Sequence, residues 1–576
     1  MTAPQPQPLR LSALRARSLL VLLCAGFILL AGRAVYLQGW HNDFLQQQGE
    51  SRYSRVVEIP ATRGMITDRN QQPLAVSTPV ESVWASPADV AITAPQLQQL
   101  ARVLEMPPQE ITQHLSESGR DFVYLKRQLP PEQAQRAAML DIPGIFLQRE
   151  YRRYYPASEA TAQIVGITDI DGKGQEGLEL AFDDRLAGIP GSRRVIKDRL
   201  GHIVEDVASI RAPKSGQDLT LSIDTNIQYL AYRELKKAVT ANHARAGSVV
   251  VLDVTTGEVL AMVNLPAYNP NDREQVDPRR ARNRAVTDLF EPGSTLKPFT
   301  VAAALESGLF TPTTVIQTAP GRMKVGNRTI HDAEPARALT VAQVIQRSSN
   351  VGAAKMGLAM PAQKLWDIFS AVGFGVAPRS DFPGEVAGRL RAYRSWRPID
   401  QAAMSYGYGI SVSLLQLARA YLIFATDGEI KPVTLLKQDA PVAGTRIIDA
   451  RIAREVRNML ELVVEPGGTA PGAQIVGYRV AGKTGTVHKL DGDGGYAADK
   501  YMASFVGFAP ASKPRLVIAV TIDEPSAGQY YGGIVAAPVF SAVAAGALRI
   551  LTAPPDAPLN NVVLPPPGAP VVREET

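Results

Sequence analysis

The stretch Glu291-Pro-Gly-Ser-Thr-Leu-Lys-Pro-Phe-Thr300 is the part of the sequence around which the remaining motifs can be ordered. A Pro-Gly pair ends the preceding element, and the apolar run 301–305 predicts a helix. Ser294 therefore lies at the start of this helix, and Lys297 follows one turn later on the same face. Pro298 has no N–H group, so the carbonyl of Ser294 loses its usual helical partner and something else must hold the turn. A serine beside an amine is typical of an activated nucleophile, although a solvated helix can carry the same letters by chance.

The composition describes an ordinary globular chain and excludes several classes of function. The 576 residues suffice for two or three domains, with 20% charged and 45% hydrophobic residues. Lys and Arg number 61 against 55 Asp and Glu, and this small excess is spread along the chain, which does not favour a nucleic-acid partner. Cys24 is the single cysteine, which excludes an internal disulfide and a cysteine-based zinc site. No phosphate loop or cofactor fingerprint stands out, and we expect neither a metal nor a cofactor.

The N-terminal region has the pattern of a membrane anchor. Residues 1–17 carry three arginines and no acid, and residues 18–38 are apolar except for Arg33 and the polar end of the segment. The apolar part is about 20 residues long, which is enough to span a bilayer, and the preceding arginines place the N-terminus in the cytoplasm. A cleaved signal peptide is the alternative, because the uninterrupted apolar core is short. No Ala-x-Ala site ends that core, so we predict an uncleaved anchor at 18–38.

Beyond the anchor, the pattern predicts two folded regions and a tail. Residues 39–217 contain short mixed elements that suggest surface turns and docking faces, and residues 218–552 read as a second domain. Residues 553–576 are rich in proline, and we expect them to be disordered. Strands followed by helices and then strands again predict an α+β fold with a mainly antiparallel sheet. The expected strands are 219–223, 246–252, 257–262, 477–481, 503–508 and 515–522, and the expected helices are 226–239, several within 340–426, and 538–550.

Two further short motifs follow Ser294 along the chain. Ser348-Ser-Asn350 begins 54 residues after Ser294, and Lys483-Thr-Gly-Thr486 is predicted on or near a strand edge. A helix cap would explain the first motif alone, and a turn would explain the second. In the order Ser-x-x-Lys, Ser-x-Asn and Lys-Thr-Gly, however, they form the signature of β-lactamases and penicillin-binding proteins.

On these motifs the chain resembles a class B penicillin-binding protein, and most closely the division-specific FtsI type of Gram-negative bacteria. Residues 63–70 (RGMITDRN), 153–156 (RYYP) and 174–177 (GQEG) resemble the family's pedestal motifs. Residues 382–385 (FPGE) and 406–412 (YGYGISV) resemble its transpeptidase motifs. Two positions depart from the usual pattern, because Gln71 stands where the family usually has Gly, and Lys-Thr-Gly replaces the Lys-Ser-Gly of many septal enzymes. These departures leave open whether this is the principal division enzyme or a paralogue.

The resemblance implies a peptidoglycan D,D-transpeptidase that is inhibited by β-lactams, and residue chemistry suggests the roles. Ser294 would attack the D-Ala-D-Ala carbonyl and hold the peptide as an ester. Lys297 would take the serine proton as a neutral amine, which asks for a pKa about 3 below the free value of about 10.4, or about 4 kcal/mol. Burial and the nearby cation Lys483 can lower that pKa. Ser348 would relay the proton to the leaving D-Ala, and Asn350 would orient Lys297 and bind the substrate amide.

A second set of residues is expected to bind the substrate. The hydroxyls of Thr484 and Thr486, together with Lys483, suit a terminal carboxylate, and Gly485 allows another backbone to approach the strand. The N–H groups of Ser294 and Thr486 would form an oxyanion hole. Tyr530 and Tyr531 either line the cleft or are ordinary tyrosines of the core or a loop.

The resemblance also implies a cellular setting: a single-pass protein of the bacterial inner membrane with a periplasmic pedestal (39–217) and transpeptidase domain (218–552). We expect the partners to be peptidoglycan stem peptides, β-lactams, a separate FtsW-type glycan polymerase and other divisome membrane proteins. The alternatives are a non-enzymatic penicillin sensor or scaffold, a D,D-carboxypeptidase, and a β-lactamase in which Glu385 would activate water. Within the class, the nearest alternative is the elongation-specific enzyme.

Overall fold

The computed structural model describes residues 13–37, 54–116, 122–197, 203–490 and 495–563. The chain forms two compact units, and each is built from separate stretches of sequence. The first comprises Met1–Ala61, Pro79–Tyr151 and Ile189–Ser215, and the second comprises Thr62–Thr78, Arg152–Gly188 and Gly216–Thr576. The two units are described separately below.

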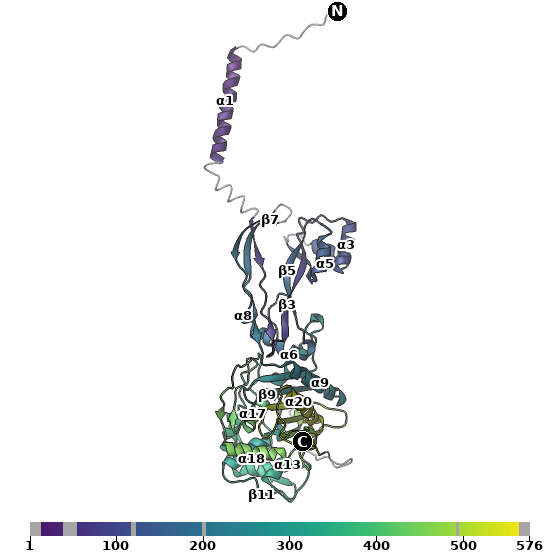
Figure 1. The fold of residues 1–576 in the computed structure, drawn as a ribbon, viewed down its shortest axis with the longest axis vertical. Coiled ribbons are helices and arrows are strands. Elements are labelled where there is room, and N and C mark those ends of the chain that lie inside the picture. The colour runs from purple at the N-terminus through teal and green to yellow at the C-terminus, as the bar shows by residue number, and fades with distance from the viewer. Residues whose placement is uncertain (1–12, 38–53, 117–121, 198–202, 491–494, 564–576) are drawn as a thin grey trace, which may run out of the picture. The chain divides into compact units, whose positions relative to one another are not determined.

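The N-terminal apolar segment forms the helix α1 (Ala13–Val35), none of whose residues is buried (Figure 1). It begins five residues before the span predicted at 18–38, and residues 38–53 lie outside the described part of the chain. Among the described residues, one other stretch, Gly532–Ile550, is long and apolar enough to cross a membrane. That stretch is more than half buried within the second unit, as expected for a core helix. The single-span prediction therefore rests on α1.

The first unit contains two sheets. In the first sheet, β6 (Gly191–Lys197) lies between β1 (Ser54–Ile59) and β7 (Ile203–Arg211), and both pairs are antiparallel. In the second, residues 79–85 of β3 (Pro73–Ala85) pair with β4 (Val123–Leu129), and β5 (Ile145–Tyr154) also pairs with β3. The alternating apolar residues of these strands pack against helices α3 (Ala94–Leu104), α4 (Pro108–Leu115) and α5 (Pro131–Ala138) in one separate core.

The predicted pedestal motifs pack within the second unit. Glu179 is fully buried and accepts hydrogen bonds from the Nε atoms of Arg63 and Arg153, both at 2.6 Å. Asp68 accepts bonds from the N–H and hydroxyl of Thr225, at 3.1 and 2.8 Å, at the start of helix α9 (Thr225–Ala241). The compact units are therefore interleaved along the chain, whereas the sequence suggested one boundary at residue 217.

A five-stranded antiparallel sheet forms the centre of the second unit, in the order β10-β9-β19-β18-β17. Its strands are β9 (Ala246–Asp253), β10 (Val259–Leu265), β17 (Ala481–Leu490), β18 (Tyr496–Ala509) and β19 (Leu516–Asp523). This arrangement confirms the α+β prediction. The strand expected at 477–481 differs, because it begins only at Ala481, so the whole Lys-Thr-Gly-Thr motif lies inside β17.

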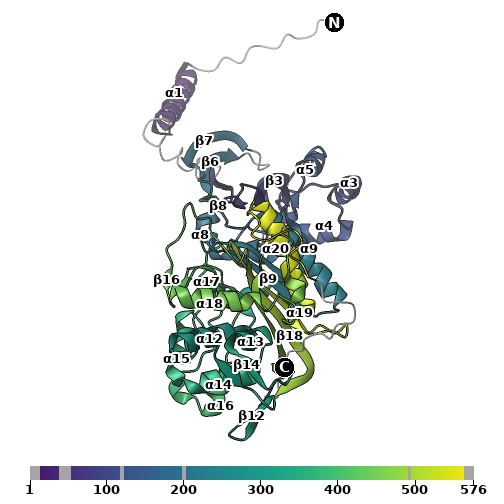
Figure 2. The same ribbon diagram turned by 60° about the horizontal axis from the view of Figure 1, so that its bottom comes forward.

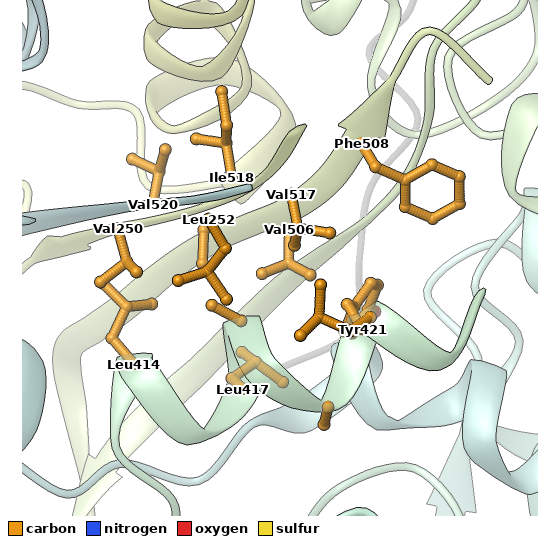
Figure 3. Packing of buried hydrophobic residues seen from close by; sticks show 14 of the residues in the cluster. Val250, Leu252, Leu414, Leu417, Tyr421, Val506, Phe508, Val517, Ile518 and Val520 are labelled. Atoms are coloured by element: carbon orange, nitrogen blue, oxygen red, sulfur yellow. The ribbon is translucent and has the colours of Figure 1, made fainter. Parts of the chain in front are cut away.

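Helices cover both faces of this sheet. Val250 and Leu252 point toward Leu414 and Leu417 of α17 (Leu414–Ala425), whereas Ile518 points to the opposite face (Figure 3). On that opposite face, α9 and α20 (Ala537–Ile550) pack beside each other (Figure 1), and Phe540 of α20 lies 4.8 Å from Phe505 between ring centroids. Burial of both faces explains why β9, β10 and β19 contain continuous apolar runs rather than alternating ones.

A group of helices lies beside the sheet, and one of them directly follows Ser294 (Figure 2). The group contains α12 (Lys297–Glu306), α13 (Val341–Gln346), α14 (Asn350–Ala359), α15 (Ala362–Ala371), α16 (Pro398–Met404) and α18 (Ala450–Glu461). Helix α12 is buried along almost its whole length and contacts α14, α15 and α18. The element that follows Ser294 is therefore fixed on several sides.

The remaining elements of the second unit are short. They are β2 (Ile66–Thr67), α6 (Ala162–Val165), α7 (Gly177–Ala181), α8 (Asp183–Leu186), β8 (Leu219–Thr220), α10 (Pro278–Ala281), α11 (Arg284–Thr287), β11 (Val315–Gln317), β12 (Arg322–Val325), β13 (Arg328–His331), β14 (Ala338–Thr340), β15 (Glu429–Ile430), β16 (Thr445–Arg446), α19 (Gly532–Val535) and the 3₁₀ turns η2 (Ser158–Ala160), η3 (Arg273–Gln275), η4 (Gly293–Leu296), η5 (Tyr393–Ser395) and η6 (Pro471–Ala473).

The start of the C-terminal tail differs from the expectation of disorder. Residues 553–563 are described and pack against the turn 475–479, where Asn561 donates to the carbonyls of Ile475 and Tyr478 at 3.0 and 2.9 Å. Polar side chains anchor this segment, so its low apolar content did not reveal the packing. Residues 564–576 lie outside the described part of the chain.

Candidate active site

Ser294 lies in the 3₁₀ turn η4, directly before α12. Because Pro298 has no N–H, the carbonyl of Ser294 accepts instead from the N–H of Lys297, one residue earlier than in an α-helix. The hydroxyl of the fully buried Tyr421 donates to the carbonyl of Thr295 at 2.7 Å. These two bonds are the additional support that the sequence required for this turn, and burial raises the pKa of Tyr421 well above its usual value, so its hydroxyl keeps its proton.

Gly293 allows the turn that carries Ser294 to lie against β17. Its φ is +53°, and a Cβ atom built at this position would lie 2.3 Å from Cγ1 of Val487. Its N–H donates to the carbonyl of Gly407 at 3.0 Å. Gly485 on β17 has the same function from the other side, since a Cβ atom there would lie 2.5 Å from Oγ of Ser504 and 3.0 Å from the carbonyl of Pro292. Two glycines therefore set the distance between the turn and the strand.

Four predicted residues converge on one buried cluster. Nζ of Lys297 lies 2.9 Å from Oγ of Ser294 and 3.1 Å from Oγ of Ser348. It also donates to the main-chain carbonyl of Ser348. Nζ of Lys483 reaches the same Ser348 hydroxyl at 2.9 Å, and both lysines are fully buried. Ser348 therefore joins the two amines, although it is 54 residues from Ser294 and 135 from Lys483 in sequence.

The backbone around Ser348 is held in an unusual conformation. Its φ is +60°, in the left-handed region, which costs a residue with a side chain about 1–3 kcal/mol. Asp332 holds the neighbouring backbone, because its carboxylate accepts from the hydroxyl of Ser349 at 2.7 Å and from the N–H of Val351 at 2.9 Å. Asp332 was not found from the sequence, since it precedes the Ser-x-Asn motif by 16 residues and belongs to no motif. Asn350 begins α14 and is buried, and its orienting role remains a prediction.

The predicted substrate-binding residues lie along β17. Oγ1 of Thr484 is 2.7 Å from Oγ1 of Thr469 and 3.2 Å from Nζ of Lys483, and Thr469 was missed by the sequence analysis. Oγ1 of Thr486 accepts from the N–H of Gly532 at 3.0 Å. The two threonine hydroxyls are thus fixed by neighbours on either side of the motif, and their role toward a carboxylate remains a prediction.

Tyr530 and Tyr531 belong to an aromatic stack. Tyr530 stacks on Tyr501 with ring centroids 4.0 Å apart and an interplanar angle of 10°, and Tyr531 follows at 4.5 Å from Tyr530. His488 of β17 lies 4.5 Å from the other side of Tyr501. The stack therefore rests on the β17–β18 pair, and Tyr531 directly precedes the Gly532 N–H that holds Thr486. His488 and Tyr501 had no sequence signal, because stacking pairs residues across strands.

The carboxylate of Glu291, three residues before Ser294, links three segments of the chain. Glu291 accepts from the N–H of Gly409 at 2.7 Å and from the hydroxyl of Tyr496 at 2.9 Å. Burial raises the pKa of Glu291, and the bonds from Gly409 and Tyr496 oppose that shift. The ring of Tyr408 lies 5.8 Å from that of Tyr496. Glu291 lies in the opening motif, but no pattern in the sequence indicates this role.

Comparison with known proteins assigns this fold and cluster to a family. Residues 247–545 match the penicillin-binding protein transpeptidase domain, and residues 58–221 match the penicillin-binding protein dimerisation domain. The chain belongs to the class B penicillin-binding proteins. It is 44% identical over 550 residues to the probable peptidoglycan D,D-transpeptidase PenA of Neisseria gonorrhoeae, covering 95% of this chain and 94% of PenA. It is 43% identical over 543 residues to the peptidoglycan D,D-transpeptidase FtsI of Escherichia coli K12, covering 93% of this chain and 91% of FtsI.

Solved structures agree with this assignment. The apo transpeptidase domain of Burkholderia pseudomallei penicillin-binding protein 3 is 49% identical, with a TM-score of 0.55, and the match covers 59% of this chain and 98% of that domain. The protein is a serine-type peptidoglycan D,D-transpeptidase, of a family that acts on peptidoglycan stem peptides and binds β-lactams. The combination of a transpeptidase domain, a dimerisation domain and an N-terminal apolar helix confirms the predicted fold class.

Proposed function

We propose that the protein cross-links peptidoglycan stem peptides at the division septum through an acyl-enzyme on Ser294. The observation that carries this proposal is the position of the Lys297 amine, 2.9 Å from Oγ of Ser294 and sharing the Ser348 hydroxyl with Lys483. A hydroxyl within hydrogen-bond reach of a buried amine is the geometry that an activated serine needs. Burial and a second nearby cation both disfavour the charged form of an amine, which suits Lys297 as the base.

In the first step, Oγ of Ser294 forms a bond to the carbonyl carbon of the penultimate D-Ala, and its proton passes to Nζ of Lys297. The peptide bond to the terminal D-Ala then breaks. The leaving nitrogen receives a proton from Lys297 through the hydroxyl of Ser348, which both amines contact. In the second step, an amine of a neighbouring stem peptide attacks the ester carbonyl, and the bond between this carbon and Oγ of Ser294 breaks. The attacking nitrogen loses a proton through the Ser348 hydroxyl and Lys297, and Oγ of Ser294 regains a proton from Lys297.

The remaining predicted residues stabilise charge. We assign the oxyanion hole to the N–H groups of Ser294 and Thr486, where one such donor is worth about 3–4 kcal/mol. Lys483 and the hydroxyls of Thr484 and Thr486 suit the terminal carboxylate of the donor peptide. This assignment is supported by the contacts of Nζ of Lys483, which lies 2.9 Å from Oγ of Ser348 and 3.2 Å from Oγ1 of Thr484. Asn350 is assigned to the substrate amide and to the orientation of Lys297.

The contacts of Glu385 favour a transferase over a hydrolase. A β-lactamase needs a positioned base for its deacylating water, and Glu385 is the acid that the sequence offers for that role. Its carboxylate instead accepts from the N–H groups of Arg379 and Ser380, at 2.7 and 3.0 Å, and from the Ser380 hydroxyl. A carboxylate that closes its own turn is a poor candidate for activating water beside Ser294.

The proposed cellular setting is the bacterial inner membrane. α1 would anchor the chain in the inner membrane with the N-terminus in the cytoplasm, because Arg15 and Arg17 lie at its beginning and positive charge is retained inside. The transpeptidase domain (218–552) and pedestal (39–217) would then be periplasmic. Because the first matched domain is a dimerisation domain rather than a polymerase, we expect an FtsW-type glycan polymerase and other divisome proteins as partners.

A labelled penicillin tests the chemistry. We expect it to acylate Ser294 alone, so that intact-mass and peptide mapping find one adduct on the full chain and none on Ser294→Ala. Pulse labelling followed by removal of free drug should then show an ester that hydrolyses about a thousandfold more slowly than it forms, as a barrier difference of about 4 kcal/mol gives. Stoichiometric labelling of Ser294→Ala would reject the nucleophile, and release within seconds would favour a hydrolase.

Depletion in the source cell tests the septal assignment. Loss of a septal transpeptidase blocks division and should give filaments, whereas loss of an elongation-specific enzyme should give round cells. Round cells would instead assign the protein to cell elongation, and the proposed chemistry at Ser294 would stay the same.

A further inference from the structure

The described tail residues 553–563, here called the C-terminal strap, are tied to the turn that leads into β17. Asp556 accepts from the main-chain N–H of Arg479 at 2.7 Å through Oδ1. Through Oδ2 it accepts from the N–H and hydroxyl of Ser512, at 3.1 and 2.6 Å. Asp556 therefore clamps Arg479, two residues before β17, to the connection between β18 and β19.

Asn561 holds the same turn from its other end. It donates to two carbonyls of the turn, as described above, and accepts from the N–H of Gly477 at 2.9 Å. The carbonyl of Gly477 in turn accepts from the N–H groups of Asp556 and Ala557, both at 3.1 Å. The hydroxyl of Tyr478 donates to the carbonyl of Ala553 at 2.7 Å. Each residue from Gly477 to Arg479 is thus bonded to the strap.

The position of β17 in the sheet explains why such a clamp matters. β17 is the last strand in the order β10-β9-β19-β18-β17, so within the described residues β18 is its one neighbour in the sheet. An edge strand has a ladder along one side and frays more readily than a central strand. Lys483 is only four residues after Arg479, and the first paired residue is Ala481. The strap anchors the entry to this strand at the N–H of Arg479, whose carbonyl accepts from the N–H of Ala511 at 2.9 Å.

We propose that the C-terminal strap positions Lys483 for the transpeptidase reaction, with Asp556 as the principal positioning residue. This inference rests on the proposed acyl-enzyme function. The main chain transmits the effect from Arg479 to Lys483, four residues later, while the Arg479 side chain is held by a bidentate pair with Glu461 of α18, at 2.8 Å for each bond. Releasing the N–H of Arg479 lets the beginning of β17 shift, and with it the Lys483 amine that contacts Ser348. A displacement of about 1 Å in a catalytic group can cost about a hundredfold in rate.

The segment also lies beside a cavity of about 340 Å³, lined by residues that include Glu461, Gln474 and Asn561. Both carboxylate oxygens of Glu461 bind Arg479, and Gln474 binds the main chain of Val464 and Val563. The polar side chains of Glu461 and Gln474 thus bind other groups of the protein. Their arrangement favours a role in positioning over a ligand site.

The test compares two truncations and three substitutions, one of them a control, in the detergent-solubilised protein that includes α1. One truncation ends after Val563 and keeps the strap, and the matched truncation ends after Thr552 and removes it. Asp556→Ala removes both acceptor oxygens, and Asp556→Asn keeps one. Leu559→Ser, at a residue that is 76% exposed, is the control substitution in the strap. For each variant, a labelled penicillin gives the acylation rate constant, the dissociation constant of the complex before acylation, and the fraction of protein labelled at saturation.

We expect the chain ending after Val563 and the Leu559→Ser variant to behave like the wild type. The chain ending after Thr552 and Asp556→Ala should acylate about tenfold to a hundredfold more slowly, with the dissociation constant changed by less than about threefold and full labelling at saturation. Asp556→Asn should recover most of the rate. Equal acylation rate constants for the two truncations would overturn the proposal. So would a loss of labelled fraction at an unchanged rate, because that would show a role in folding alone. Failure of the wild type to be labelled at Ser294 would instead reject the proposed function.

Discussion

Replacing Gly293 with alanine should displace the turn that carries Ser294. A second substitution should partly reverse this effect. The added Cβ would lie 2.3 Å from Cγ1 of Val487, and such overpacking of a close-packed site costs about 1–3 kcal/mol. The φ of +53° adds about 1–2 kcal/mol for a residue with a side chain. The sum is about 2–5 kcal/mol. If this whole free-energy cost is added to the acylation barrier, the acylation rate falls by a factor of roughly 30 to several thousand.

The variant Val487→Ala separates the two contributions, because it removes the clashing methyl groups and leaves the backbone strain. The double variant should therefore keep only about 1–2 kcal/mol of the defect, or about a 5- to 30-fold loss of rate relative to Val487→Ala. The assay is the acylation rate constant for a labelled penicillin, measured on the wild type, both single variants and the double variant. The four rates form a double-mutant cycle. Additive effects within about twofold, or a Gly293→Ala variant that acylates at the wild-type rate, would refute the argument that this glycine is required by the approach of β17.

Two other predictions follow from the site. Lys297→Arg should abolish acylation while the protein stays folded, because a guanidinium keeps its charge and cannot accept the serine proton; acylation near the wild-type rate in a mass-spectrometric time course would contradict this. Glu291 gives a pH dependence. Burial raises its pKa above the ordinary value of 4.5, so the folded state holds this proton more tightly than the unfolded state does, and ionisation of Glu291 opposes folding. The wild type should therefore lose thermal stability relative to Glu291→Gln as pH rises from about 4.5 through the folded pKa, as scanning calorimetry at several pH values would detect; a constant difference in melting temperature would argue against it.

The sequence by itself determined the order of strands and helices in the second domain and the proximity of Ser294 to Lys297. The spacing of Ser294 and Lys297 predicts that both side chains lie on one face of the chain. In the structure, Nζ of Lys297 lies 2.9 Å from Oγ of Ser294. Unbroken apolar runs marked β9 and β19, because strands covered on both faces need no alternation. Pro298 already required that something other than the helical ladder hold the turn.

Only the tertiary structure decided which distant residues meet. Tyr421, Asp332, Thr469 and Asp556 support the site from other elements, and none has a sequence pattern of its own, since a hydrogen bond across the fold leaves no periodicity along the chain. The tail shows this most clearly. Its composition predicts disorder because it has little apolar surface to bury, yet Asp556 and Asn561 order residues 553–563 through bonds to main-chain groups. Local spacing therefore fixes what the chain can do at Ser294, whereas the positions of Ser348 and Lys483 around it depend on packing that brings together residues more than 100 positions apart.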